Sequence, residues 1–162
     1  MSEKSSLDQE RLMIAHFTEP LGLDYEFEDW PLHISILPWF HRNKEIAVAE
    51  LELAVVHMKS CRIALGAKAL DSVEFFGVNE DIPVRRVKDC TSLGVMHGML
   101  LSQFQLDLED KTFIGGAYNP HLTIRENEDP GEGFEIDIKD ISLVEYGKPV
   151  KKVVQTFNLR NL

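Results

Sequence analysis

Two short segments of this chain repeat one pattern, and they limit its fold more than any other feature. Residues 31–36 read Pro-Leu-His-Ile-Ser-Ile, and residues 119–124 read Asn-Pro-His-Leu-Thr-Ile. Each segment is typical of an apolar β-strand in which a histidine precedes a hydroxyl residue by two positions. Because successive side chains on a strand point to opposite faces, each histidine shares a face with its hydroxyl neighbour. Two such strands can direct four polar side chains into a common cleft: His33, Ser35, His121 and Thr123.

The hydrophobic pattern elsewhere predicts two helices among many strands. The helices span 44–59, after Asn43 as N-cap, and 91–104, each with an apolar stripe. Clustered strands indicate an α+β fold with helices packed outside antiparallel sheets. One motif in each half indicates two similar lobes facing each other within a single domain, 1–162. The predicted strands are 11–17, 32–37 (ended by Pro38), 62–70, 72–77, 83–87 and 117–125, with two or three more after residue 133.

Composition restricts the classes of partner. The 162-residue chain has a formal net charge of -10, which argues against a broad nucleic-acid surface because Lys and Arg hold phosphate backbones. One nucleotide or one RNA end can still bind in a locally neutral cleft. Cys61 and Cys90 lack metal-ligand spacing, which indicates buried thiols. We find no secretory leader and no membrane-spanning apolar run, and so expect a soluble, cytoplasmic monomer with a polar lead-in at residues 1–10.

The repetition of the motif gives it chemical meaning. A single His-x-Ser or His-x-Thr is common by chance, and alone it indicates an ordinary strand histidine. Two copies, each in an apolar strand near a proline, provide two imidazoles that titrate near neutrality, so one can act as base while the other acts as acid. The hydroxyls can donate hydrogen bonds to phosphate oxygens and stabilise charge without a metal or other cofactor.

These paired motifs, in a chain of this length, resemble those of the 2H phosphoesterases, in particular the 2'-5' RNA ligase and cyclic phosphodiesterase group. The opening strand RLMIAHF and the closing FEIDIKDISLVEYG and VVQTFNL are similar as well. The resemblance implies two antiparallel sheets around a central cleft and metal-independent chemistry on 2',3'-cyclic or 2'-5' phosphates of nucleotides or RNA ends. It also implies that His33 and His121 are catalytic and that Ser35 and Thr123 contact the phosphate.

Three neighbours of the motifs are candidate substrate contacts. Arg125 continues the alternation of the second motif and can bind phosphate, or it can be a solvated arginine at the strand end. Tyr118 and Trp39 can stack a base, although such aromatic residues more often form the core or a cleft wall. His97, on the apolar stripe of the second helix, is expected to pack in the core. His16 on the first strand is a further candidate for the cleft.

Two alternative functions remain open from the sequence. A catalytically idle member of the same fold would bind a nucleotide or RNA end in the cleft without turnover. An unrelated α+β interaction protein would carry the two motifs by coincidence, with the two imidazoles pointing apart.

Overall fold

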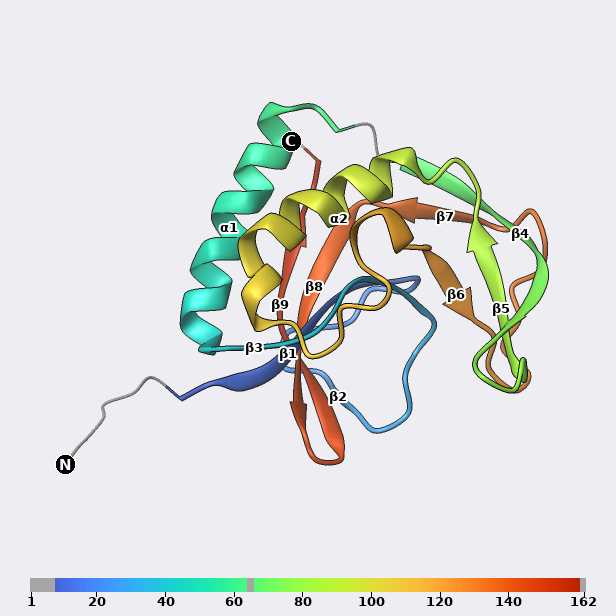
Figure 1. The fold of residues 1–162 in the computed structure, drawn as a ribbon, viewed down its shortest axis with the longest axis horizontal. Coiled ribbons are helices and arrows are strands. Elements are labelled where there is room, and N and C mark those ends of the chain that lie inside the picture. The colour runs from blue at the N-terminus through green and yellow to red at the C-terminus, as the bar shows by residue number, and fades with distance from the viewer. Residues whose placement is uncertain (1–7, 64–65, 161–162) are drawn as a thin grey trace.

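Antiparallel strands make up most of the computed structural model, which describes residues 8–63 and 66–160 (Figure 1). The prediction of an α+β fold is confirmed. The strands are β1 (Glu10–Phe17), β2 (Glu26–Phe27), β3 (His33–Arg42), β4 (Gly66–Phe76), β5 (Ile82–Val87), β6 (His121–Thr123), β7 (Glu135–Ile138), β8 (Asp140–Gly147) and β9 (Val150–Asn158). The helices are α1 (Lys44–Ser60) and α2 (Thr91–Phe104), with 3₁₀ turns at Gln105–Asp107 and Gly115–Ala117.

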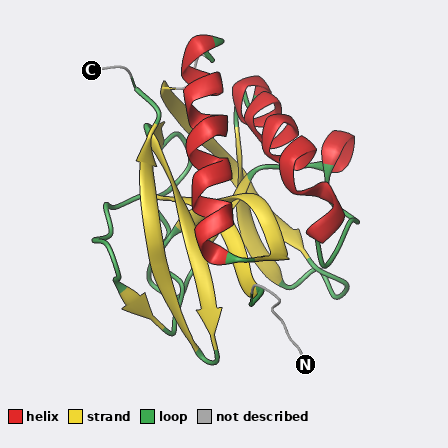
Figure 2. Cartoon of the chain, turned by 90° about the vertical axis from the view of Figure 1, so that its left-hand side faces the viewer, coloured by secondary structure: helices red, strands yellow, loops and turns green. Residues whose placement is uncertain are grey.

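The nine strands form one sheet in the order β2-β9-β8-β1-β3-β6-β5-β4-β7. This arrangement differs from the two facing sheets expected from the sequence. The two motif strands, β3 and β6, lie side by side near the middle of that order, so hydrogen bonding between them joins the two halves of the chain. Both helices lie on one side of the sheet (Figure 2).

The helices follow the sequence signals closely. Asn43 caps α1 by accepting a hydrogen bond from the backbone N–H of Ile46 at 3.1 Å, which satisfies a donor that the first turn leaves free. The buried positions of α1 recur at helical spacing, as predicted, and α2 spans the predicted range. None of the described helices is long and apolar enough to span a membrane.

Two apolar clusters lie on opposite faces of β1, as its alternation requires. The larger cluster contains Leu12 and Ile14 and fills the space between the sheet and the helices. The smaller cluster lies on the other face, where the half-buried Trp30 and Trp39 pack against it. The residues of the smaller cluster are Met13, Ala15, Phe17, Phe27, Val144 and Val153.

Two strand boundaries differ from the prediction. Pro38 does not end its strand, because β3 continues to Arg42. The pairing of β3 with β1 shifts register between Leu37 and Phe40, and a proline is tolerated at such a bulge because its missing N–H breaks no regular ladder. The second motif strand is shorter than expected, because 115–117 form a 3₁₀ turn and β6 ends at Thr123.

Several smaller expectations also changed. The predicted strands 62–70 and 72–77 form one strand, β4, which begins at Gly66. Residues 64 and 65 of the first predicted strand, and residues 1–7 of the expected lead-in, lie outside the described part of the chain. The loop 19–30 contains the short strand β2. Both cysteines are free, but Cys61 is exposed and Cys90 half-buried, so the expectation of two buried thiols was wrong.

Candidate active site

The pairing of β3 with β6 brings the two motifs together. Ile34 lies opposite Leu122 in antiparallel register, and both are fully buried in the larger cluster. Directly paired residues point to the same face, so their neighbours along each strand project from the other face. Four half-buried polar side chains therefore share that face: His33, Ser35, His121 and Thr123.

The register also determines which of these side chains are neighbours. Antiparallel pairing at Ile34 and Leu122 places His33 beside Thr123 and Ser35 beside His121. Each imidazole thus has a hydroxyl on its own strand and another on the neighbouring strand. The sequence predicted a common face for these groups, and the sheet produces it through adjacent strands.

Both histidine rings are held in the same way. The Nδ1 of His33 lies 2.8 Å from the backbone carbonyl of Pro31, and the Nδ1 of His121 lies 2.8 Å from the carbonyl of Asn119. A carbonyl only accepts, so each Nδ1 carries the proton and donates it. The Nε2 atom of each ring then remains available, as an acceptor when the ring is neutral and as a donor when it is protonated.

Aromatic side chains enclose His33. The Trp30 ring stacks on it with centroids 4.4 Å apart and planes inclined by 30°. Phe17, the cross-strand partner of His33, places its ring centroid 5.9 Å from the imidazole. These contacts remove water from the imidazole and restrict its rotation.

The surroundings of His33 change its protonation. Burial lowers the pKa of His33 to about 4, and the backbone carbonyl of Pro31, which favours the charged form, offsets only part of this effect. The positive charges of Arg125 and His121 lower the pKa further, in that order. Their influence on the same imidazole indicates that the three side chains face a common space. His33 is therefore neutral at pH 7.

The surroundings of His121 are different. Phe76 on β4 meets its ring edge to face, at 4.8 Å and 64°. Arg86 lies opposite His121 in the pairing of β5 with β6, and so shares its face. The Arg86 guanidinium lies 5.5 Å from the Phe76 ring and makes a 2.7 Å ion pair with Glu74. His121 thus lies beside a charged pair, whereas His33 lies among apolar rings.

Of the three predicted neighbours, Arg125 is the one whose charge acts on a motif histidine, because it lowers the pKa of His33. It lies two residues after the end of β6, is half-buried and makes an isolated backbone bridge to Glu128. Within residues 8–63 and 66–160, no carboxylate lies within ion-pair distance of its guanidinium. Its charge therefore remains available to an anion on this face.

Trp39 and Tyr118 lie in different places. Trp39 packs on the same face as His33, 6.0 Å from Trp30, with the Arg11 guanidinium 4.5 Å from its ring. Tyr118 instead packs against the larger cluster, and its hydroxyl donates a 2.8 Å hydrogen bond to the backbone carbonyl of Ser35. The structure thus brings Trp39 near the first motif but does not place Tyr118 on the shared face.

His97 is the packed core histidine that the sequence predicted. Its Nδ1 donates to the carbonyl of Ile36 at 2.8 Å, and its other ring nitrogen accepts from the N–H of Gly115 at 3.0 Å. Its ring stacks on Tyr118 with centroids 4.0 Å apart. Burial lowers the pKa of His97, and both ring nitrogens are occupied in the neutral form.

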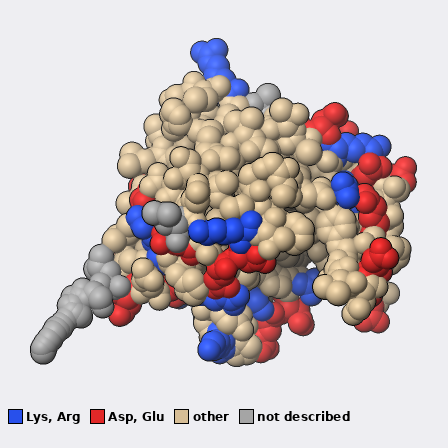
Figure 3. All heavy atoms as spheres, viewed as in Figure 1, with Lys and Arg blue, Asp and Glu red and all other residues tan. Residues whose placement is uncertain are grey.

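Trp30 and Phe76 are the site neighbours that the sequence did not identify. Trp30 lies three positions before His33, so an aromatic residue so near the motif was an available signal. Phe76 reaches His121 only through the pairing of β4 with β5 and of β5 with β6, and the local sequence does not predict this pairing. Figure 3 shows a hollow between the part built on β4, β5 and β7 and the part built on β8 and β9, with Lys or Arg atoms on its wall.

The arrangement has the elements of acid–base chemistry on a phosphate. It offers two Nε2 atoms, two hydroxyls and a cation on one face. In the part of the chain that the structure describes, no three His, Cys, Asp or Glu side chains are grouped to hold a metal ion.

Comparison with known proteins identifies the fold of this chain through solved structures. No model of a protein family matches the sequence, and no curated protein matches it. Solved structures do match. A structure described as a phosphoesterase aligns with a TM-score of 0.62 and 14% identity, over 95% of this chain and 100% of that chain. E. coli LigT complexed with 3'-AMP aligns with a TM-score of 0.63 and 14% identity over the same shares.

A third structure, TT0787 of Thermus thermophilus, aligns with a TM-score of 0.53 and 18% identity over 93% of this chain and 98% of that chain. These alignments cover nearly the whole of each chain. They show that this protein has the fold of LigT and of the matched phosphoesterase. The resemblance stated from the sequence is thereby confirmed at the level of the fold.

Proposed function

We propose that this protein is a phosphoesterase of the 2H type, acting on 2',3'-cyclic phosphates or 2'-5' phosphodiester linkages of nucleotides or RNA ends. One observation carries the proposal. Two histidines on adjacent strands, each with Nδ1 donating to the carbonyl two residues earlier, share one face with two hydroxyls. The fold that the chain shares with LigT and a phosphoesterase supports it.

In the hydrolytic direction, His33 is the general base and His121 the general acid. His33 is neutral at pH 7, so its Nε2 can take a proton from water as the water oxygen bonds to phosphorus. The bond from phosphorus to the leaving ribose oxygen breaks, and the Nε2 of His121 gives that oxygen its proton. In the reverse direction, which makes the linkage, the two roles exchange.

The remaining polar groups stabilise the phosphate. The hydroxyls of Ser35 and Thr123 donate to its nonbridging oxygens, and Arg125 balances the charge that develops there. Donors fixed in place before the reaction stabilise the transition state without reorganising. No resident metal is required in this mechanism.

The substrate class follows from charge and from the matched structures. Solved structures of E. coli LigT contain 3'-AMP, phosphate, NADP+ or ATP, so that protein binds nucleotides. This chain has a formal net charge of -10, which disfavours a long RNA backbone. We therefore place a nucleotide or a single RNA end between the histidines.

Hydrolysis of adenosine 2',3'-cyclic phosphate by the purified protein, with a chelator present, tests the proposal. His33→Ala and His121→Ala should each lower kcat/KM by about a thousandfold, since each removes one proton transfer. His57→Ala, which changes an exposed histidine of α1, is the matched control and should retain activity. Turnover that persists in both single variants would sink the proposal. Nucleotide binding without turnover in the wild type would point to the idle binding module.

A further inference from the structure

The outer surface of the two helices exposes apolar side chains where α1 and α2 lie side by side (Figure 1). Gln103 of α2 donates a hydrogen bond to the carboxylate of Glu50 on α1, which joins the two helices. Leu53 lies three positions after Glu50, and Val95 lies eight positions before Gln103, so helical spacing places both along this join. Leu53 is 72% exposed and Val95 is 49% exposed. We call the outer surface around Leu53 and Val95 the helix face.

Helix α2 contributes no charge to the helix face. Its 14 residues contain no Asp, Glu, Lys or Arg, although charged residues make up 27% of the chain. A surface helix normally carries charged residues opposite its buried stripe. Figure 3 shows that no charged atoms lie over α2, and that Lys, Arg, Asp and Glu atoms gather around that region. Covering this surface therefore removes few charges from water, which keeps the cost of a contact low.

Two glycines of α2 leave open space on the helix face. Gly94 and Gly98 are exposed, and a Cβ at either position would meet no other described segment within 4 Å. The packing of this chain therefore does not require glycine at either position. Glycine is the least favourable helix residue apart from proline, so the two glycines weaken α2 without a gain inside the molecule. Small residues allow the backbone of a second helix to approach closely.

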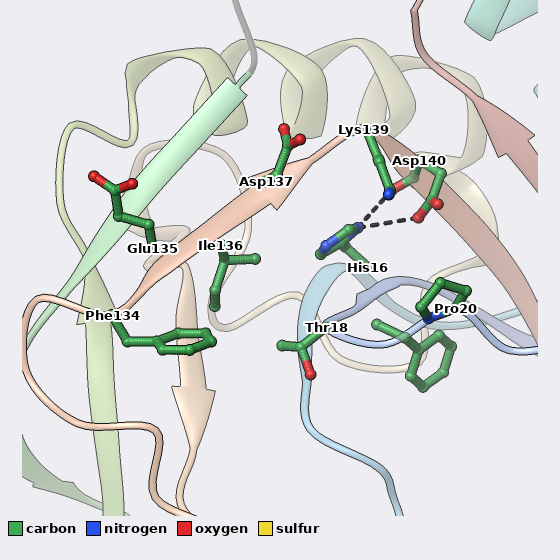
Figure 4. Close-up of a pocket in the computed structure, with 10 residues that line it drawn as sticks. His16, Thr18, Pro20, Phe134, Glu135, Ile136, Asp137, Lys139 and Asp140 are labelled. Carbon is green, nitrogen blue, oxygen red and sulfur yellow. Dashed lines mark hydrogen bonds and ion pairs between the residues drawn. The ribbon is translucent and has the colours of Figure 1, made fainter.

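The charge of the chain indicates what can cover the helix face. Each copy has a formal net charge of -10, so two copies repel each other. The cavity of about 220 Å³ between the end of β1 and strand β7 illustrates a surface where this repulsion is strong, since three carboxylates and one lysine line it (Figure 4). Repulsion is weakest where both approaching surfaces lack charge. The helix face therefore suits a second copy of the same chain.

We infer that two copies of this chain associate through the helix face, with α2 of one copy crossing α2 of the other at Gly94 and Gly98. A two-fold axis brings the same surface of each copy together, so Leu53 and Val95 of both copies enter one apolar contact. The paired motif histidines lie on the opposite face of the sheet and stay open in the dimer. The dimer replaces the monomer expected from the sequence.

Sedimentation velocity of the purified full chain tests the inference. A contact of two helices lies at the small end of stable interfaces, so we expect a dissociation constant of about 10 µM and a mass approaching twice 18.5 kDa at about 100 µM. Val95→Glu should raise the dissociation constant at least tenfold, because it buries an unpaired charge in the dimer. Gly98→Leu should act in the same direction, because its side chain fills the crossing point. Both positions are exposed, so both variants should fold, and thermal unfolding checks this.

Val78→Glu is the matched control, because Val78 is fully exposed in the turn between β4 and β5, away from the helix face. It should leave the dissociation constant within twofold. A wild type that stays monomeric at about 200 µM would overturn the inference. So would a dimer that neither Val95→Glu nor Gly98→Leu weakens, or one that Val78→Glu weakens equally. Flotation with phosphatidylcholine vesicles covers another occupant, since vesicle binding by a monomer, lost in Val95→Glu, would assign the helix face to a lipid surface and reject the second copy.

Discussion

The two motifs have the same local geometry but different surroundings. Each histidine donates its Nδ1 proton to the carbonyl two residues earlier, at 2.8 Å in both cases. His33 begins the ten-residue strand β3 and lies under Trp30. His121 begins the three-residue strand β6 and meets the edge of Phe76. The short motif thus orients each ring, and distant segments decide the environment of that ring.

This difference suits an acid and a base. Acid–base catalysis by two imidazoles needs one ring neutral to accept a proton and the other protonated to donate one. Burial among apolar rings keeps His33 neutral, since its pKa lies at about 4. The proposed mechanism therefore uses the buried imidazole as base.

The largest difference between the two histidine variants is expected with a substrate whose leaving group does not need a proton. With a cyclic nucleotide, His33→Gln and His121→Gln should each lower kcat/KM by about a thousandfold. With a p-nitrophenyl phosphodiester, whose leaving group departs as a stable anion, His121→Gln should lose only about tenfold. His33→Gln should remain strongly impaired, because the water must still be deprotonated. Steady-state kinetics on both substrates measure this difference.

Both glutamine variants are compared with the wild type by thermal unfolding, so that a folding defect is not mistaken for a catalytic one. Equal losses of the two variants on both substrates would show that the histidines do not divide the roles. The opposite pattern, with His33→Gln recovered by the good leaving group, would exchange the assignments.

The next effect concerns pH. If His33 is the base, kcat/KM should fall as the pH drops through about 4, where its imidazole becomes protonated, and should be retained at pH 5.5. Trp30→Leu exposes the ring to water, which should raise the pKa of His33 and move this acidic limb upward by roughly one unit. NMR titration of the His33 ring measures the same change directly.

Phe76→Leu is the matched control, because it removes an aromatic ring from His121 instead of His33. It should leave the acidic limb where it is in the wild type. A wild-type limb near the ordinary histidine range, or equal shifts in the two variants, would contradict the role of Trp30.

Features that depend on neighbouring residues in the sequence were predicted well. Alternation placed each histidine on the face of its hydroxyl, and the cap at Asn43 with the apolar stripe defined α1. The helical spacing of His97 correctly predicted a core position. These features are determined by backbone periodicity, which is present in the sequence itself.

Features that depend on long-range pairing were not predicted. The sequence suggested lobes facing each other, whereas Ile34 pairs with Leu122 inside one sheet. Pro38 was expected to end its strand, because a proline cannot donate to the ladder. The bulge against β1 that accommodates it depends on the register of the partner strand, which the local sequence does not contain. The contact of Phe76 with His121 arises from the pairing of β4, β5 and β6 in the same way.

The smallest effect concerns Tyr118, which links the two motifs from behind the site. Its hydroxyl donates to the carbonyl of Ser35, and burial raises its pKa, so it remains a donor at neutral pH. Tyr118→Phe should lower the free energy of unfolding by about 1 kcal/mol, because a carbonyl loses its partner, with kcat/KM within twofold. Urea denaturation and kinetics measure both, and Tyr25→Phe, at a 46% exposed tyrosine, is the control. Unchanged stability with a markedly raised KM would contradict this role and would indicate that Tyr118 contacts the substrate. The two motifs would then be held together by the pairing of β3 with β6 alone.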